Sequence, residues 1–326
     1  MKKLFTFLFL GLFLFSLASC DFSVKDDKKV ITIVQLLSHE ALDKATEGIK
    51  AGLAEKGFVD GKNVKINVLN PQAKDDLLAQ MAEQALLESD LIFCVATPAA
   101  QAVKEKALEL GSNVPMLFTA VTDGVESGII PSNEHPGGNI SGTSDLNPVK
   151  EQVKLFKDLN INEFGFIYSS GEDNSIIQLN LAKKACNDLG LSVREFSVTN
   201  AESDLELVLN SITSSGLKGV YIPTDNVMSA NVAHIANVLN QAGIVTIAGE
   251  EAMVNNGATL TYGSVNYLSL GKATGFMGAK VLEGTKAGDL PVEYSPSTDL
   301  FINKSAVESF NLPLPQEFLN KATKTI

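Results

Sequence analysis

Arginine and cysteine are scarce in this 326-residue sequence, which has one arginine, Arg194, and three cysteines. The guanidinium group of arginine binds a carboxylate or phosphate best, because it can donate two parallel hydrogen bonds. With so little arginine, the protein would have to bind a purely anionic ligand through helix ends, hydroxyls and lysines. Cys94 lies in an apolar run and Cys186 on an expected helix, and neither has a metal-binding or redox spacing. We interpret them as two separate core thiols, with a disulfide between them as the alternative.

The motifs of several enzyme and metal sites are also missing. Neither GxxxxGK[ST] nor GxGxxG occurs, so no phosphate-binding loop is predicted, and no GxSxG marks a nucleophile elbow. His39 and Glu40 lack the second histidine of a zinc motif, and His135 and His234 stand alone in the sequence. We therefore expect no metal ion, no cofactor and no enzymatic activity.

Basic residues are outnumbered, because 26 Lys and Arg oppose 38 Asp and Glu and give a net charge of -12. An acidic surface repels phosphate backbones, so we expect no nucleic-acid partner. The length and the 45% hydrophobic composition predict two domains, each large enough to bury a core.

The amino terminus has the pattern of a signal peptide, predicted here at residues 1–19. Lys2 and Lys3 precede an apolar run at 4–17, which is shorter than the ~20 residues of a membrane span. Removing it takes away two lysines and no acid, which leaves a charge of -14. The run Leu17-Ala18-Ser19-Cys20 resembles the lipobox of bacterial lipoproteins, which implies a lipid on Cys20 and a charged tether at 20–29. An ordinary secretory signal is the alternative.

Apolar runs alternate with helical periodicity along the rest of the chain. This order predicts an α/β fold of two Rossmann-like lobes, each a parallel sheet flanked by helices. In the helix at 268–282 we expect the glycines to pack tightly. The expected strands are 30–34, 64–69, 91–96, 116–120, 164–168, 191–198, 219–222, 244–248 and 258–265. The expected helices are 42–53, 77–86, 99–110, 175–189, 204–212, one that ends at Gln241, 268–282 and a short last one.

Polar residues follow most of these strands directly. Ligands of parallel α/β sheets bind beyond the carboxyl ends of the strands, where helix N-termini also begin, so two facing rows of such residues predict a cleft. The segment 116–145, a strand followed by Gly and Pro breakers, is interpreted as the crossover between the lobes. The polar tips are Gln35, Thr97, Thr122 and Asp123 in the first lobe and Ser169, Thr224, Asp225 and Glu250 in the second.

Each candidate binding residue has a structural alternative. Acids can hold a cationic group, or they can cap a helix or form a hinge turn. Hydroxyls can donate to a carboxylate or cap a helix, and amides can both donate to and accept from an amino-acid backbone or form turns. Tyrosines can stack on an aromatic ligand or pack in a core. The acids are Asp123, Asp145, Asp225, Glu250 and Glu251; the hydroxyl and amide residues are Thr97, Thr122, Ser144, Thr224, Asn174, Asn226 and Asn266; the tyrosines are Tyr168, Tyr221, Tyr262 and Tyr267. Gln35, His39 and Glu40 complete the set.

Seven stretches in order resemble the substrate-binding lipoproteins of a bacterial ABC-transporter family with the type I periplasmic-binding fold. They are QLLSHEALD (35–43), VATPAAQAV (95–103), FTAVTDGVESG (118–128), GGNISGTSDLNPVKEQ (137–152), VYIPTDN (220–226), GEEAMV (249–254) and NYLSLG (266–271). The sequence departs from the family at Gly124, where a proline is usual, and at Asn266, where an aspartate is common.

The resemblance implies a three-segment hinge between lobe 1, residues 30–145 plus 267–296, and lobe 2, residues 146–266 plus 297–322. It also implies a lipid-anchored protein on the outer face of the cytoplasmic membrane, with an ABC permease and its ATPase as partners. Some members of the family bind aromatic amino acids such as tryptophan, which is therefore the expected ligand class. A sugar or nucleoside ligand, an α/β hydrolase, and a surface sensor or adhesin remain the alternatives.

Overall fold

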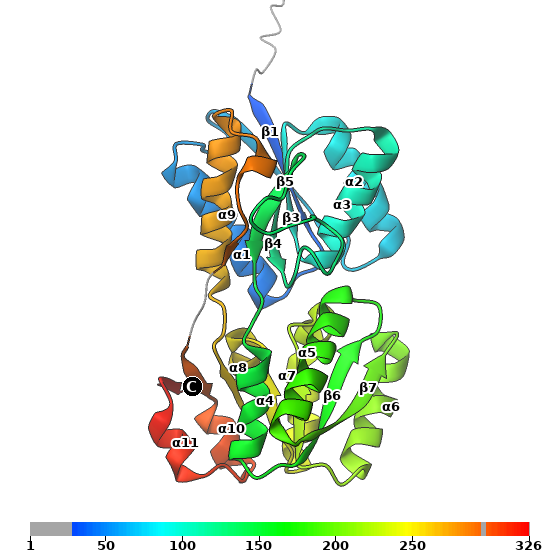
Figure 1. Cartoon of the computed structure of the whole chain (residues 1–326), viewed down its shortest axis with the longest axis vertical. Coiled ribbons are helices and arrows are strands. Elements are labelled where there is room, and N and C mark those ends of the chain that lie inside the picture. The colour runs from blue at the N-terminus through cyan, green and yellow to red at the C-terminus, as the bar shows by residue number, and fades with distance from the viewer. Residues whose placement is uncertain (1–27, 295–297, 326) are drawn as a thin grey trace, which may run out of the picture.

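The computed structural model describes residues 28–294 and 298–325 and contains two separate sheets (Figure 1). The first sheet has the strand order β11-β5-β4-β3-β1-β2, and all its paired strands are parallel. Helices α1 and α9 cover one face, and α2 and α3 cover the other. The strands are β1 (Lys29–Gln35), β2 (Val64–Leu69), β3 (Leu91–Val95), β4 (Met116–Val121), β5 (Ile140–Ser144) and β11 (Glu293–Tyr294). The helices are α1 (Glu40–Glu55), α2 (Asp75–Glu88), α3 (Thr97–Leu110) and α9 (Tyr267–Leu282), with the short η1 (Ala287–Asp289).

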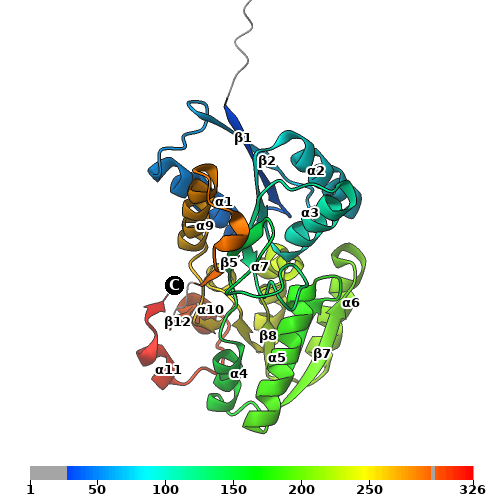
Figure 2. The same ribbon diagram turned by 45° about the horizontal axis from the view of Figure 1, so that its top comes forward.

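The second sheet has the order β13-β12-β10-β9-β8-β6-β7, with one antiparallel pair between β10 and β12. The helices α10 and α11 lie beside α4 in both views (Figures 1 and 2). The strands are β6 (Glu163–Ser169), β7 (Ser192–Val198), β8 (Gly219–Ile222), β9 (Val245–Ala248), β10 (Leu260–Tyr262), β12 (Leu300–Ile302) and β13 (Lys324–Thr325). The helices are α4 (Val149–Asp158), α5 (Asp173–Leu189), α6 (Ala201–Ser214), α7 (Asn226–Gln241), α8 (Glu251–Asn255), α10 (Lys304–Ser309) and α11 (Gln316–Lys321). The predicted fold class, two parallel sheets flanked by helices, is confirmed.

The chain passes between the two sheets three times, after β5, after β10 and between β11 and β12. The expected crossover across 116–145 is therefore wrong, because the chain leaves the first sheet at β4 and returns to it as β5. The sequence of β5, ISGTS, has a single large apolar residue, Ile140, yet four of its five residues are buried. A Cβ on Gly142 would lie 2.1 Å from the carbonyl oxygen of Phe118, so glycine lets β5 approach β4 closely.

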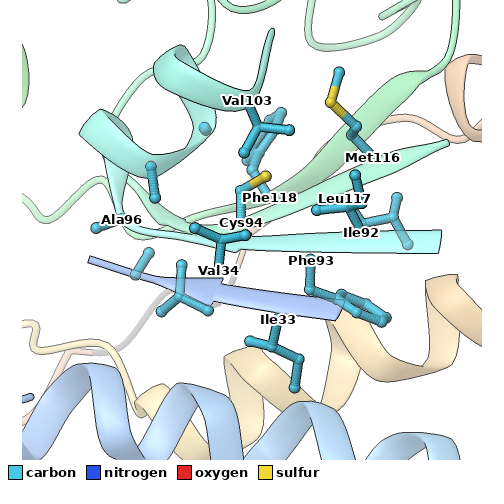
Figure 3. Close-up of a cluster of buried hydrophobic side chains, with 14 of the residues drawn as sticks. Ile33, Val34, Ile92, Phe93, Cys94, Ala96, Val103, Met116, Leu117 and Phe118 are labelled. Atoms are coloured by element: carbon cyan, nitrogen blue, oxygen red, sulfur yellow. The ribbon is translucent and has the colours of Figure 1, made fainter. Parts of the chain in front are cut away.

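The central strands of the first sheet carry apolar side chains on both faces. Ile33, Phe93 and Leu117 are fully buried there, and their packing is visible in Figure 3. A parallel strand that is covered by helices on both faces has a continuous run of apolar residues in its sequence, so these strands could be predicted from the sequence. Cys94 belongs to this core and Cys186 to the core of the second lobe; both thiols are free, which confirms two separate core cysteines. Burial raises the pKa of Cys94 to about 12.

Helices α1 and α9 pack backbone against backbone through glycines. A Cβ on Gly271 would lie 2.0 Å from the carbonyl oxygen of Ala45, and one on Gly52 would lie 2.4 Å from that of Lys272. Gly48 and Gly275 are similarly crowded. The expected tight packing of the helix at 268–282 is confirmed.

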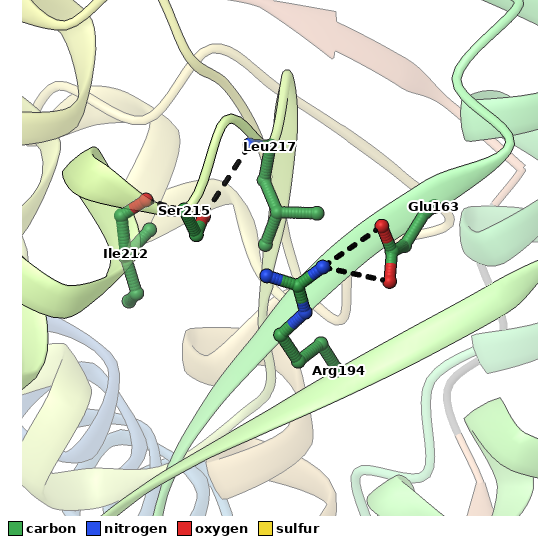
Figure 4. Close-up of polar contacts among 5 residues, drawn as sticks. All are labelled: Glu163, Arg194, Ile212, Ser215 and Leu217. Carbon is green, nitrogen blue, oxygen red and sulfur yellow. Dashed lines mark hydrogen bonds and ion pairs between the residues drawn. The ribbon is translucent and has the colours of Figure 1, made fainter.

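Arg194 lies at the amino end of the second sheet, on the edge opposite to the polar strand tips. Its Nη2 donates to both carboxylate oxygens of Glu163, each at 3.0 Å, between β7 and β6 (Figure 4). The same figure shows the end of α6, where Ser215 Oγ donates to the carbonyl of Ile212. The one arginine of the sequence is thus already paired and is remote from any ligand at the strand tips.

The predicted signal peptide, Cys20 and most of the tether lie outside the described residues. Within 28–294 and 298–325, no helix combines the length and the apolar character needed to cross a membrane.

Candidate functional site: a cleft between two sheets

The carboxyl ends of the two sheets face each other across a narrow cleft, which has a free volume of only about 10 Å³. Half of the fourteen predicted ligand-binding residues line it: His39, Thr122, Asp145, Asn174, Thr224, Asn226 and Glu250. Leu42, Ala120, Ser229 and Tyr267 complete the lining. The sequence analysis named Tyr267 only as a stacking candidate and missed the other three. Leu42 and Ala120 are apolar, and Ser229 lies within a helix and not at the end of a strand, so none of them was marked as a polar strand tip.

Two buried carboxyl groups share one tyrosine hydroxyl in the cleft. Tyr267 Oη donates to Asp145 Oδ2 at 2.8 Å and also interacts with Glu250, which accepts from Ser229 Oγ at 2.8 Å. The other oxygen of Asp145, Oδ1, is buried and has no partner. Burial raises the pKa of Asp145 to about 6 and that of Glu250 to about 7. We name Asp145, Tyr267 and Glu250 the Tyr267 cluster.

A second feature lies at the ends of the adjacent strands β3 and β4. Ala96 (φ 89°) and Ala120 (φ 53°) both adopt backbone conformations that are rare for residues with a Cβ, and such strain is typical of functional sites. Ala96 is the N-cap of α3 and offers it no side-chain hydrogen bond. The hydroxyl of Thr97 is buried and has no partner. This helix N-terminus therefore has free donor capacity.

Asp225 and Glu172 use their carboxylates inside the second lobe. Asp225 accepts from Ser169 N, Ser175 Oγ and Met228 N, so it caps α7 and does not line the cleft. Glu172 accepts from the backbone N–H groups of Asn226 and Val227, and from the side chain of Asn226. Burial raises the pKa of both acids, and the neighbouring charge of Asp225 adds to the effect on Glu172. The sequence analysis missed Glu172. Its position as an acidic residue in the polar loop after β6 was the feature that could have indicated it.

Other predicted site residues have structural partners away from the cleft lining. Gln35 bonds Leu37, Asp43 and Thr46 within the first lobe. Asp123 accepts from the N–H groups of Val125 and Glu126, Ser144 Oγ donates to the carbonyl of Thr122, and Asn266 caps α9. Glu40, Glu251 and Asn266 line a neighbouring groove beside Tyr267. Asp225 and Asn266 cap helices, and Asp123 closes the turn after β4, which is the turn alternative.

Three of the four tyrosines lie outside the cleft. Tyr221 stacks on Phe166, and Tyr168 meets the same ring edge-on, so both pack in the core. Tyr262 lines a surface pocket with Phe318. Among the described residues, no group of three or more His, Cys, Asp or Glu side chains is placed to hold a metal ion.

Hydrogen bonds join the two lobes across the cleft. Gln101 on α3 donates to Asp173 on α5 at 2.7 Å, and Asn256 donates to Glu40 at 3.0 Å. His39 Nε2 lies 3.4 Å from Asn226 Oδ1, and burial lowers the pKa of His39, which favours its neutral form. The lobes are in direct contact.

The sequence profile of the ABC transporter substrate binding protein family matches residues 30–326. The chain belongs to this family. A relative named as a tyrosine-binding protein, from Clostridioides difficile strain R20291, is 34% identical over 288 residues, which cover 87% of this chain and 81% of the relative.

Two solved structures are also similar to this substrate-binding protein. An ABC domain from Streptococcus pneumonia in complex with L-Trp is 30% identical, covers 92% of this chain and 100% of its own, and has a TM-score of 0.85. The ligand-free, open structure of a substrate binding protein with adhesive properties from Clostridium difficile is 31% identical, covers 91% and 98%, and has a TM-score of 0.67. At nearly equal identity, the chain as a whole is more similar to the ligand complex than to the open structure.

Proposed function

We propose that this ABC transporter substrate-binding protein binds an aromatic amino acid of the tryptophan or tyrosine type between its lobes, without enzymatic activity. The relative named as a tyrosine-binding protein and the solved complex with L-Trp support this ligand class. The cleft itself carries the proposal: the buried carboxyl groups of Asp145 and Glu250 line it, and none of the described residues that line it is a lysine or arginine. Buried carboxylates need an opposite charge, and a ligand ammonium supplies one.

The carboxylate of the amino acid would bind at the N-terminus of α3. The unpartnered hydroxyl of Thr97, the hydroxyl of Thr122 and the positive end of the helix dipole favour an anion there. Leu42 and Ala120 offer apolar surface to the ligand side chain. Asn174, Thr224 and Asn226 would supply further polar contacts from the second lobe.

Lobe closure is the proposed mechanism. The ligand contacts lobe 1 (30–145 plus 267–296) and lobe 2 (146–266 plus 297–322) together, so it favours the closed state by its differential affinity for that state. The three passages of the chain between the sheets act as the hinge and absorb the rotation.

The protein would act outside the cytoplasm, tethered by lipid on Cys20, and would deliver its ligand to an ABC permease driven by a separate ATPase. The lipobox-like run ending at Cys20 supports the anchor. Fractionation of cells that express Cys20→Ser should move the protein from the membrane to the soluble fraction. Retention of the variant in the membrane fraction after signal cleavage would contradict the lipid anchor.

Calorimetry and thermal shift with L-tryptophan, L-tyrosine, L-leucine, a sugar and a nucleoside test the ligand class. At a hundredfold excess over its dissociation constant, the ligand should add ~2.7 kcal/mol to the free energy of unfolding. Tryptamine and indole-3-propionate each lack one charged end of tryptophan, so each should bind at least tenfold more weakly than L-tryptophan. Stabilisation by the sugar or the nucleoside, with none by the aromatic amino acids, would overturn the proposal.

A further inference from the structure

The hydroxyl group of Tyr267 contacts two buried carboxyl groups, those of Asp145 and Glu250, and Glu250 also accepts from Ser229 Oγ. The Asp145 and Glu250 side chains are 4% and 2% exposed, so water stabilises neither charge. Tyr267 donates its single proton to Asp145, and its oxygen then turns a lone pair toward Glu250. Tyr267 has one proton to donate, so its hydroxyl cannot donate to both carboxylates at once, and the negative charge of Glu250 disfavours ionisation of Asp145. Below about pH 7, the closed protein without ligand therefore keeps a proton on one of the two carboxyl groups.

The other ionisable groups around the cluster do not supply a compensating cation. His39 is kept neutral by burial, while Glu40 and Asp225 add negative charge. Glu172 accepts several N–H donors at the N-terminus of α7, but burial and the charge of Asp225 still raise its pKa to about 7, so it supplies no cation. Two lysines near the neighbouring groove form salt bridges with other acids: Lys44 with Glu47 at 3.1 Å, and Lys324 with Glu251 at 3.8 Å.

We propose that the Tyr267 cluster is an ammonium subsite that works by exchange, in which the ligand's ammonium replaces a proton that the free protein holds on the cluster. This inference rests on the proposed function. An ammonium has three N–H donors, and the cluster offers matching acceptors: the unpartnered Asp145 Oδ1 and the ionised carboxylate of Glu250. The charge balances, since one cation enters the cleft and one proton leaves for solvent. The subsite selects ligands with a cationic amine and rejects their deaminated analogues.

The exchange makes binding depend on pH in a defined direction. Below the raised pKa of Glu250, about 7, the free protein binds the proton that the complex must release, so affinity falls as the pH falls. For a group with this pKa, the dissociation constant should rise roughly 25-fold from about pH 7.5 to about pH 5.5. The ligand ammonium and carboxylate do not titrate in this range.

Titration calorimetry of the mature protein with L-tryptophan and L-tyrosine tests the exchange. Buffers of different ionisation enthalpy at one pH report the number of protons released, which should be roughly three quarters at about pH 6.5. Glu250→Gln should abolish both the proton release and the pH dependence of the dissociation constant. Glu83→Gln, which removes an exposed acid on α2, is the matched control and should retain both. If Glu250→Gln does not fold, Asp145→Asn serves in its place, because it also removes one of the two competing charges.

The outcomes separate the two proposals. Binding of an aromatic amino acid with no proton release, or with proton uptake, would overturn the exchange and leave the ligand class standing. Proton release that survives Glu250→Gln and disappears in Glu172→Gln would also overturn it. Absence of binding by either amino acid between pH 5.5 and 7.5 would overturn the proposed function, and the exchange with it.

Discussion

At the scale of single residues, buried polar atoms without partners mark the places where this protein is incomplete without a ligand. The hydroxyl of Thr97 and the Oδ1 atom of Asp145 are both buried and unpartnered. Leaving such a group unsatisfied costs ~1–3 kcal/mol, so stability is lost at each site until a ligand arrives. The free protein is therefore less stable than its packing allows.

Thr97→Val should separate stability from binding. Removing the unpartnered hydroxyl should leave the free protein as stable as before, or more stable by ~1 kcal/mol. The same change should weaken binding of the aromatic amino acid about tenfold or more, because a hydrogen bond to a charged group contributes ~1.5–3 kcal/mol. Urea denaturation and calorimetry measure the two effects.

Thr259→Val is the matched control. The hydroxyl of Thr259 is buried far from the cleft and accepts a hydrogen bond from Thr246 N at 3.0 Å, so its loss should destabilise the fold and leave affinity unchanged. A loss of stability in Thr97→Val, without a change in affinity, would give Thr97 a purely structural role.

At the scale of elements, the packing of α1 against α9 links the cleft to the hinge. His39 precedes α1 and Tyr267 begins α9, so both helices start at the cleft. Glycines hold the two helices in backbone contact along their length. Since a close-packed pair moves as one body, a displacement of Tyr267 is transmitted to the whole first lobe.

Gly271→Ala should destabilise the protein by at least ~2 kcal/mol, because the new methyl group would overlap the carbonyl oxygen of Ala45 and force the helices apart. Urea denaturation gives the free energy of unfolding. Gly171→Ala adds the same methyl group where the nearest heavy atom, Ser169 Oγ, is 4.0 Å away, and should change the stability by less than ~0.5 kcal/mol. Equal effects of the two substitutions would contradict the role of the close contact.

At the scale of the whole molecule, side-chain contacts between the lobes stabilise the closed state together with the ligand. The hydrogen bond from Gln101 to Asp173 at 2.7 Å is made only when the lobes meet, since α3 and α5 belong to different sheets. Such contacts set the balance between open and closed forms in the free protein.

Gln101→Ala should shift the free protein toward the open state. The loss of ~1 kcal/mol of closed-state stabilisation should weaken ligand binding about fivefold. Small-angle X-ray scattering should find the free variant more extended than the free native protein, and the two should match once ligand saturates them. Gln84→Ala, which removes a hydrogen bond within α2, is the control and should leave the scattering unchanged. Identical scattering of free Gln101→Ala and the native protein would rule out the contribution of this contact.

The sequence by itself determined the order of strands and helices and the edge of the sheets at which the cleft lies. These follow from local patterns: apolar runs give buried strands, 3.6-residue periodicity gives helices, and parallel strands bring their carboxyl ends together. It failed at β5, because small hydroxyl residues resemble a connector until Gly142 is seen against Phe118. The profile of the family and the fold agree with the sequence interpretation.

Only the tertiary structure decided what each polar residue does. Asp225 and Asp145 both follow strands and precede helices, yet Asp225 is saturated by the N-terminus of α7 and the loop after β6, while Asp145 keeps a free oxygen and shares Tyr267 with Glu250. The partners of a side chain come from segments distant in the sequence, and local periodicity carries no information about them. For this reason the position of the cleft was predictable, and its division into capping acids and acids that await a cation was not.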